Sequence, residues 1–224
     1  MLFRSVLYWY RMATATSTVW DSLEQWTPRL FLLAGVILIV ASANYAVPVL
    51  LEGVEFNSWI GLTVVVGRWI SLLGVAGLTV GIVAHSSRAG TVSRAVVSLA
   101  LLFTTGLVGT AILSNVGVST QLSAVFGFGT ILLSIITYAL FGIVILRTDA
   151  YSTVVGALLL VMTAGLLWGF VGQIALAETQ QMLGVIGTTA EAVLFAVNLA
   201  LGYRLQTEVE PSGRSDPTPE TVAE

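Results

Sequence analysis

Several residue types that build reactive sites are missing or almost missing from this chain. It contains no cysteine and no lysine, and its single histidine is His85. Without cysteine the chain forms no disulfide, thiolate metal site or iron–sulfur cluster. One histidine is too few for a paired-histidine haem or a histidine-rich metal site, and without lysine there is no amine for a retinal Schiff base. We therefore expect no metal and no cofactor.

Charged side chains are also scarce. Only 9% of the 224 residues are charged, whereas soluble domains average about 25%. Hydrophobic residues make up 56% of the chain, and the mean hydropathy is +0.94. So few charges do not cover a surface that faces water, which excludes a soluble globular enzyme, a nucleic-acid-binding protein and a disordered protein. The composition predicts a multi-pass α-helical membrane protein whose main partner is the lipid bilayer.

Six apolar runs are each long enough to cross a hydrocarbon core about 30 Å thick at 1.5 Å per residue. They are Leu30–Leu51, Trp59–Ala84, Ala95–Val116, Leu122–Leu146, Thr153–Leu176 and Met182–Tyr203. The connections between them are short, so consecutive helices should be antiparallel neighbours. The sequence thus predicts an all-α fold, an integral membrane six-helix bundle.

The arginines fall on one side of this predicted bundle. The segments before the first run, after the second, after the fourth and after the sixth hold eight arginines: Arg4, Arg11, Arg29, Arg88, Arg94, Arg147, Arg204 and Arg214. The alternate connections hold Glu52, Glu55 and Glu178 and no arginine. Because loops rich in basic residues stay in the cytoplasm, we expect a protein of the cytoplasmic membrane with both termini inside.

The runs divide the chain into three parts. Residues 1–29 should form a cytoplasmic segment with short helices on the membrane surface, one at the start and a second over Val19–Trp26 that Pro28 stops. An over-extended start, with Met12 rather than Met1 as the initiator, is an open alternative. Residues 30–203 form the membrane domain. Residues 204–224, rich in proline, serine and glutamate from position 206 onward, predict a disordered acidic cytoplasmic tail.

Glycine lines one face of two runs. These glycines are Gly67, Gly74, Gly77 and Gly81 in the second run and Gly165, Gly169 and Gly172 in the fifth. Lipid tails provide no hydrophobic drive for helix association, so close packing through small residues takes its place. We expect both stripes to pack within the chain, and a homodimer interface is the alternative.

Polar residues recur at helical spacing and should face the interior of the bundle. The sixth run carries Gly184, Thr188, Glu191 and Asn198, the fourth carries Thr130, Ser134, Thr137 and Tyr138, and the first carries Asn44 four residues before Pro48. From these positions and the fifth run we predict a polar lining of Asn44, Gln173, Thr188 and Asn198.

Only two charged residues lie inside the six runs, Arg68 and Glu191. Each lies nine residues from the same predicted end of its run, which places both about 14 Å deep. A lone charge at a helix centre costs roughly 2.5–3.5 kcal/mol on insertion scales. We therefore predict that these two side chains pair. The pair either fixes the helix register or forms a functional site, with Glu191 as the protonatable gate or cation ligand.

Short similar segments recur in the sequence and are consistent with duplicated helical hairpins. Gly81–Arg88 before the third run parallels Gly142–Arg147 before the fifth, and Thr104–Leu107 resembles Thr163–Leu166. Duplication would explain these matches, but apolar segments use few residue types and also match by chance. Both explanations stay open.

The sequence carries no enzyme signature that we recognise: it has no H-E-x-x-H, G-x-S-x-G, P-loop or G-x-G-x-x-G pattern. We therefore expect a non-enzymatic protein, foremost a structural or accessory component that serves a membrane-protein partner or homo-oligomer. The alternative is a small transporter or channel component that uses Arg68 and Glu191. A water-filled cavity reaching Glu191 would favour transport, and a dry packed bundle would favour the accessory role.

Three segments carry a resemblance to a known group. Trp20–Pro28, Leu146–Ala150 and Asn198–Arg204 resemble segments of multi-pass membrane proteins of haloarchaea, over roughly residues 18–206. The resemblance implies a membrane location and a six-helix layout, and it brings no activity and no functional residues. Lysine depletion and the net charge of −3 agree with a halophilic source, although a GC-rich genome would also replace lysine by arginine.

Overall fold

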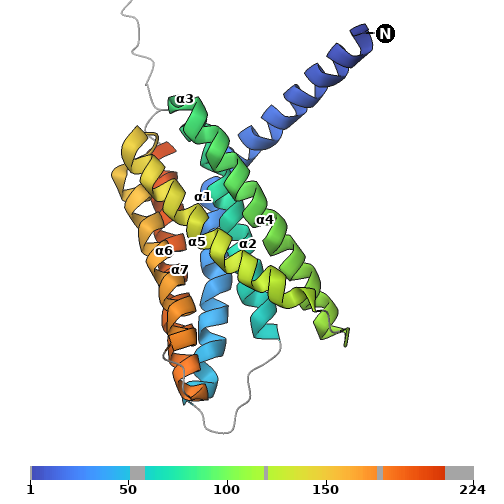
Figure 1. Ribbon diagram of the computed structural model, residues 1–224. Coiled ribbons are helices and arrows are strands. Elements are labelled where there is room, and N and C mark those ends of the chain that lie inside the picture. The colour runs from blue at the N-terminus through green and yellow to red at the C-terminus, as the bar shows by residue number, and fades with distance from the viewer. Residues whose placement is uncertain (1, 51–58, 119–120, 176–178, 210–224) are drawn as a thin grey trace, which may run out of the picture.

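The computed structural model describes residues 2–50, 59–118, 121–175 and 179–209, and within these ranges the chain is all-α. Seven helices follow one another there (Figure 1). They are α1 (Leu2–Leu50), α2 (Trp59–Gly77), α3 (Thr79–His85), α4 (Ser87–Asn115), α5 (Leu122–Thr148), α6 (Thr153–Ala175) and α7 (Gln180–Val209).

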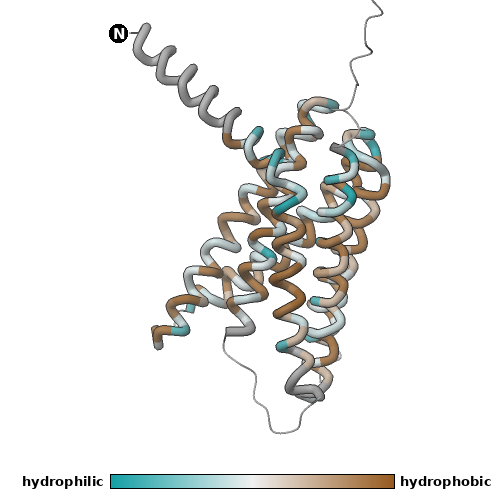
Figure 2. Tube along the Cα trace, turned by 180° about the vertical axis from the view of Figure 1, so that it is seen from behind, coloured by the Kyte–Doolittle hydropathy of each residue, from teal (hydrophilic) through white to brown (hydrophobic). Residues whose placement is uncertain are grey.

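Within the described residues, six helical stretches are long and apolar enough to cross a membrane, and α2 and α3 together make one of them. Figure 2 shows hydrophobic residues along the body of the bundle, with hydrophilic residues concentrated toward the end that holds α3. The predicted fold class is confirmed, and the chain is a multi-pass membrane protein.

The spans form a closed ring in chain order. α1 packs against α2, α2 against α4, α4 against α5, α5 against α6 and α6 against α7, and α7 returns to pack along α1. Short connections between consecutive spans make them antiparallel neighbours. Residues of α2, α5, α6 and α7 meet inside the ring, and all seven helices contribute buried residues to the hydrophobic core.

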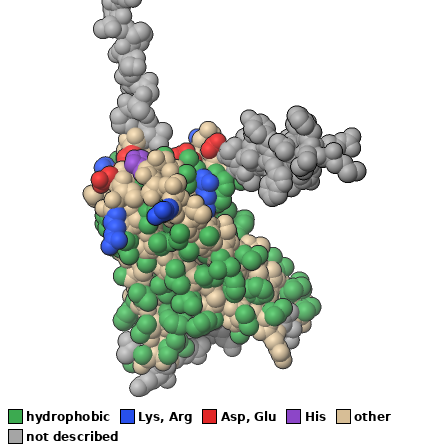
Figure 3. All heavy atoms as spheres, turned by 45° about the horizontal axis from the view of Figure 1, so that its top comes forward, with side chains coloured by type: hydrophobic (Ala, Val, Ile, Leu, Met, Phe, Trp, Pro, Cys, Tyr) green, Lys and Arg blue, Asp and Glu red, His purple; other side chains and the backbone are tan. Residues whose placement is uncertain are grey.

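The two ends of the bundle differ in charge. At one end lie the start of α4, with Arg88 and Arg94, the last turn of α5, with Arg147, and the end of α7, with Arg204. We call this the basic end. Figure 3 shows charged side chains gathered there and a flank of hydrophobic side chains below them.

α1 is one helix across a position where we predicted a stop. Pro28 lies inside it, so the separate surface helix over Val19–Trp26 is wrong. Proline removes one helical hydrogen bond, a loss that membrane helices tolerate. The preceding residue ties this turn to the neighbouring helix, because Thr27 Oγ1 donates to Leu23 O at 2.8 Å and to Gly74 O of α2 at 3.4 Å. Packing against α2 therefore accompanies the passage of α1 through Pro28.

The second predicted helix is interrupted near the basic end. α2 ends at Gly77, and α3 begins at Thr79. Leu78 N donates to Val75 O at 3.1 Å, one residue closer than in a regular α-helix. The carbonyl of Gly74 instead accepts the hydrogen bond from Thr27 Oγ1. The contact between α1 and α2 therefore accompanies the break, which hydrophobic periodicity did not signal.

α7 extends further than predicted. It runs to Val209, so the first six residues of the predicted tail, 204–209, are helical, and the remainder lies outside the described residues. Arg204 Nε lies 3.1 Å from Glu208 Oε1 one turn later, a spacing that supports a helix. Leu205 between them is buried and ties this turn to the core.

Candidate intramembrane site

Glycine faces set the position of α2. A Cβ added to Gly67 would come within 2.8 Å of Leu38 on α1, and one on Gly77 would overlap Thr27 and come within 2.7 Å of Leu23 O. Gly74 faces the ring of Phe31. These backbones lie close because no side chain separates them. The stripe on α2 therefore packs on α1 of the same chain.

The glycine face of α6 likewise lets α7 pack closely against it. A Cβ on Gly165 would approach Val193 to 2.9 Å, and one on Gly172 would approach Ile186 to 2.9 Å. Gly169 faces Ala190 at 3.0 Å. Packing within the chain is thus confirmed for both stripes, and neither face is left for a homodimer. The last glycine of the second run, Gly81, faces Tyr151 in the turn between α5 and α6.

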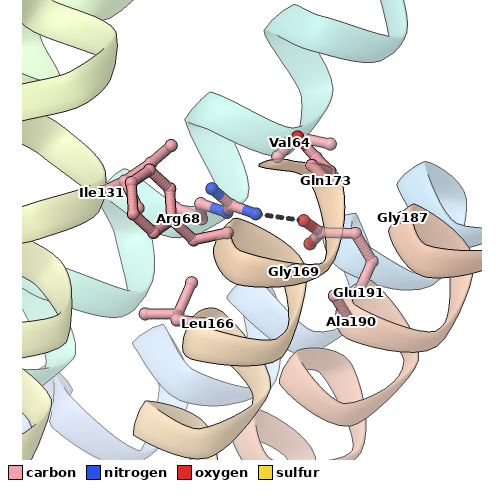
Figure 4. A pocket seen from close by; sticks show the side chains of 10 residues that line it. Val64, Arg68, Ile131, Leu166, Gly169, Gln173, Gly187, Ala190 and Glu191 are labelled. Carbon is pink, nitrogen blue, oxygen red and sulfur yellow. Dashed lines mark hydrogen bonds and ion pairs between the residues drawn. The ribbon is translucent and has the colours of Figure 1, made fainter. Parts of the chain in front are cut away.

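Arg68 and Glu191 meet inside the ring. Arg68 Nη2 donates a hydrogen bond to Glu191 Oε1 (Figure 4). The carboxylate side chain is 3% exposed and the arginine side chain 21%. α2 and α7 are not neighbours in the ring, since each packs on α1 from its own side. The pair therefore bridges the interior, as the matched depths of the two residues predicted.

Pairing makes this burial tolerable. A buried carboxylate or guanidinium without a counter-charge carries a large desolvation cost. The mutual attraction of the pair offsets that cost without adding much net stability. The second carboxylate oxygen of Glu191, Oε2, is buried and has no hydrogen-bond partner among the described residues. The site therefore contains a carboxylate oxygen with unused acceptor capacity.

A cavity of about 150 Å³ lies against the pair (Figure 4). Its lining comes from α2, α5, α6 and α7: Val64, Arg68, Ile131, Leu166, Gly169, Phe170, Gln173, Gly187, Ala190 and Glu191. A water molecule takes about 30 Å³ in the liquid, so several fit. Gln173 is exposed in the last turn of α6. The cavity therefore leads from the buried carboxylate toward the end of the bundle opposite the basic end.

A second, smaller chamber continues from the pair toward the basic end. It is lined by Leu38, Arg68, Ser71, Ser134, Tyr138, Leu166, Leu194 and Asn198, and it has no room for a water molecule. Tyr138 Oη donates to Ser71 Oγ at 2.9 Å. Asn198 Nδ2 donates to Leu194 O at 2.7 Å. We call this the inner chamber and the larger one the outer cavity; Arg68 and Leu166 line both.

The predicted polar lining is only partly present. Gln173 lines the outer cavity and Asn198 the inner chamber. Thr188 and Asn44 line neither of these two chambers, and their place in a polar lining stays a prediction. The backbone carbonyl of Thr188, three residues before Glu191, accepts from Ser42 Oγ of α1 at 3.4 Å.

The polar stripe of α5 is confirmed as an interior face. Thr130, Ser134, Thr137 and Tyr138 are each at most 2% exposed. The sequence patterns did not identify Ser71 of α2, which accepts the hydrogen bond of Tyr138. The signal was available, because Ser71 follows Arg68 by three residues and so shares its face.

Comparison with known proteins gives no relative: no family model, curated protein or solved structure matches this chain. The resemblance to haloarchaeal membrane proteins stays a prediction.

Proposed function

We propose that this protein is a small transporter or channel component that moves a small cation across the membrane, with Arg68 and Glu191 as its intramembrane site. The proposal depends above all on one observation, the cavity that reaches the buried Glu191 carboxylate. Ionisable residues inside a membrane commonly line ion or substrate pathways. A polar cavity beside such a residue supplies the access that a merely structural ion pair does not need.

The free carboxylate oxygen favours a cation. Glu191 Oε1 is engaged by Arg68, whereas Oε2 has no partner among the described residues. An oxygen of this kind accepts a proton or contributes to binding a positive ion. Gln173, the other side chain with an oxygen in the cavity lining, is a neutral contact on the entry route.

The arginines favour an orientation for this site. With the basic end in the cytoplasm, both termini of the chain are cytoplasmic and the outer cavity faces the outside of the cell membrane. Access from one side only is the arrangement of alternating-access transporters, whose sites lie near the bilayer midplane.

A second candidate is the structural or accessory role. The inner chamber has no room for water, so the route from the cavity ends at Arg68. In this second role the pair fixes α2 relative to α7, and the bundle serves a membrane-protein partner or a homo-oligomer.

Ion flux in proteoliposomes distinguishes the two roles. Purified protein is reconstituted in vesicles that contain a pH-sensitive dye or a sodium- or potassium-sensitive dye, and each gradient is imposed in turn. We expect the wild-type protein to dissipate at least one gradient faster than protein-free vesicles, and Glu191→Gln to return the rate to that background.

Thr104→Val serves as the matched control, because Thr104 is buried on α4 and donates only to Ala100 O of its own helix. This variant should retain wild-type flux. If wild-type protein dissipates none of the three gradients, the transport proposal is wrong and the accessory role is favoured.

A further inference from the structure

The outer cavity has the size of a small organic molecule. Its volume is about 150 Å³, and a cavity of roughly that volume in a protein interior holds a molecule as large as benzene. Most of the side chains that line it are hydrocarbon, those of Val64, Ile131, Leu166 and Phe170 among them. An occupant therefore gains free energy by burying a short hydrocarbon part against these walls.

The same lining is poor in ligands for a bare metal ion. Among the described residues that line it, only Glu191 and Gln173 have side-chain oxygens, whereas hard metal cations take about six or more oxygen ligands. In the described part of the chain, no three His, Asp or Glu side chains are grouped to hold a metal ion. An inorganic cation in this cavity must keep most of its water ligands, and the apolar walls contribute nothing to its binding.

One buried oxygen in the lining suits an ammonium group. The Glu191 side chain is 3% exposed, and its Oε2 has no hydrogen-bond partner among the described residues. Arg68 engages the other oxygen, Oε1, so a new donor reaches Oε2 without displacing that contact. A primary ammonium group has three N–H donors, and its hydrogen bond to a carboxylate is stronger than one between neutral groups. Gln173 offers a second side-chain oxygen to the same group.

The aromatic ring of Phe170 adds a second attraction for an organic cation. The charge of Glu191 alone holds a cation weakly, because the positive charge of Arg68 balances it. The face of an aromatic ring attracts a cation, and its carbon atoms also pack against hydrocarbon. The ring of Phe170 is positioned by an edge contact to Phe128 of α5, with centroids 5.9 Å apart and planes at 61°. The cavity thus combines a charged acceptor, an aromatic ring and apolar walls.

We infer that the outer cavity binds a small primary alkylammonium ion, with the ammonium group at Glu191 Oε2 and Gln173 and the hydrocarbon chain against Phe170 and the apolar walls. The inference rests on the proposed function in one respect, that the bound ion occupies the path of the transported cation. It stops there, because the inner chamber has no room even for water. The alkylammonium ion is therefore a ligand of this site and a blocker of transport, and its binding does not itself require transport.

Thermal unfolding in detergent measures the binding. Propylammonium chloride is titrated at pH 7, where the amine is protonated, and sodium chloride keeps the ionic strength constant. We expect the melting temperature to rise and then to saturate, because a ligand that binds only the folded protein stabilises it. Propan-1-ol has the same chain without the charge, and tetrapropylammonium has the charge without an N–H donor and is too large. Neither should stabilise the protein, and equal effects of propylammonium and propan-1-ol would overturn the inference.

Two variants locate the ligand. Glu191→Gln should raise the half-saturating concentration of propylammonium by about tenfold or more, because it removes the charged acceptor. Phe170→Leu should raise it by about threefold, because it removes the contact between the cation and the ring. Phe103→Leu is the control: Phe103 makes the same kind of edge contact, to Phe126 at 5.9 Å, and lines neither chamber. If Glu191→Gln does not fold, Phe170→Leu decides, and a change no larger than that of Phe103→Leu would overturn the site.

The outcomes separate this inference from the transport proposal. Flux of protons, sodium or potassium without stabilisation by propylammonium contradicts the ammonium site and leaves transport standing. Stabilisation without flux of any of these ions contradicts transport and leaves the ammonium site standing. Where both occur, propylammonium on both sides of the vesicles should halve the flux at its half-saturating concentration, and flux that it does not slow would overturn the block.

Discussion

The helices pack differently at the two ends of the bundle. Near the basic end, glycines bring backbones into direct contact: a Cβ on Gly77 would overlap Thr27, and one on Gly142 would lie 2.9 Å from Gly156 O. Toward the opposite end, Gly106 and Gly172 approach only side chains, those of Phe126 and Ile186, and the exposed Gly61 and Gly109 have nothing within 4 Å of the corresponding position. We call the first end, with its backbone contacts, the tight base, and the second, with side-chain contacts or open space, the loose end.

The charged pair lies where these two regimes meet. On its loose side the outer cavity has space for water, and on its tight side the inner chamber has none. The tip of the α4–α5 hairpin continues the loose side, with Val116 and Val125 more than half exposed and available to lipid. In the proposed transport role, the tight base would hold the helices in place while the loose end admits solutes to Glu191.

The largest effect should come from adding one methyl group at the tight base. Gly77→Ala forces a Cβ into Thr27 Oγ1 and Leu23 O, and because that carbonyl is backbone we expect a loss of about 3 kcal/mol in the free energy of unfolding. The matched change Gly109→Ala meets open space and should gain up to about 1 kcal/mol from helix propensity. Thermal unfolding in detergent measures both, and equal melting temperatures for the two variants would break the comparison.

The second-largest loss of stability should come from breaking the charged pair, which lies between the tight base and the loose end. Glu191→Gln leaves the guanidinium of Arg68 without its counter-charge, and we expect a loss of roughly 2–3 kcal/mol, at or just below the usual range for a broken buried pair because Arg68 is partly exposed. The double variant Arg68→Leu with Glu191→Leu removes both charges and should recover most of that loss. A Glu191→Gln protein that melts with the wild type would mean that the pair does not form.

The smallest effect is the loss of a single hydroxyl at the base. Thr27→Val keeps the side-chain shape but removes the donor to Leu23 O and Gly74 O, at a cost of about 1 kcal/mol. Thr91→Val is the control, because Thr91 is exposed and donates only to Ser87 O in its own helix; it should change stability by less than about 0.5 kcal/mol. Similar losses in both would show that the contact between α1 and α2 contributes nothing there.

Sequence patterns predicted the features that the lipid hydrocarbon around the helices imposes. A helix that crosses hydrocarbon must be long and apolar, and a charged side chain inside it needs a counter-charge. The six spans could therefore be derived from the lengths of the apolar runs, and the contact between Arg68 and Glu191 from the matched depths of the two residues in the membrane. The interior faces of α5 and the glycine faces of α2 and α6 followed from helical spacing for the same reason.

Other features depended on contacts between helices distant in the sequence. The passage of α1 through Pro28 and the break at Leu78 arise where Thr27 meets Gly74, and no local signal marks that contact. The cavity also had no sequence signal, because it is a gap between residues of four helices.

Access to the carboxylate is the claim on which transport depends, and cysteine labelling tests it most directly. The chain has no native cysteine, so Ala190→Cys, which adds one thiol to the lining next to Glu191, can be treated in intact cells with a small charged methanethiosulfonate. Ala41→Cys on α1 is the control, being equally buried but outside both chambers. We predict that Cys at position 190 is modified from outside the cell while Cys at position 41 is not; equal protection of both would contradict the account.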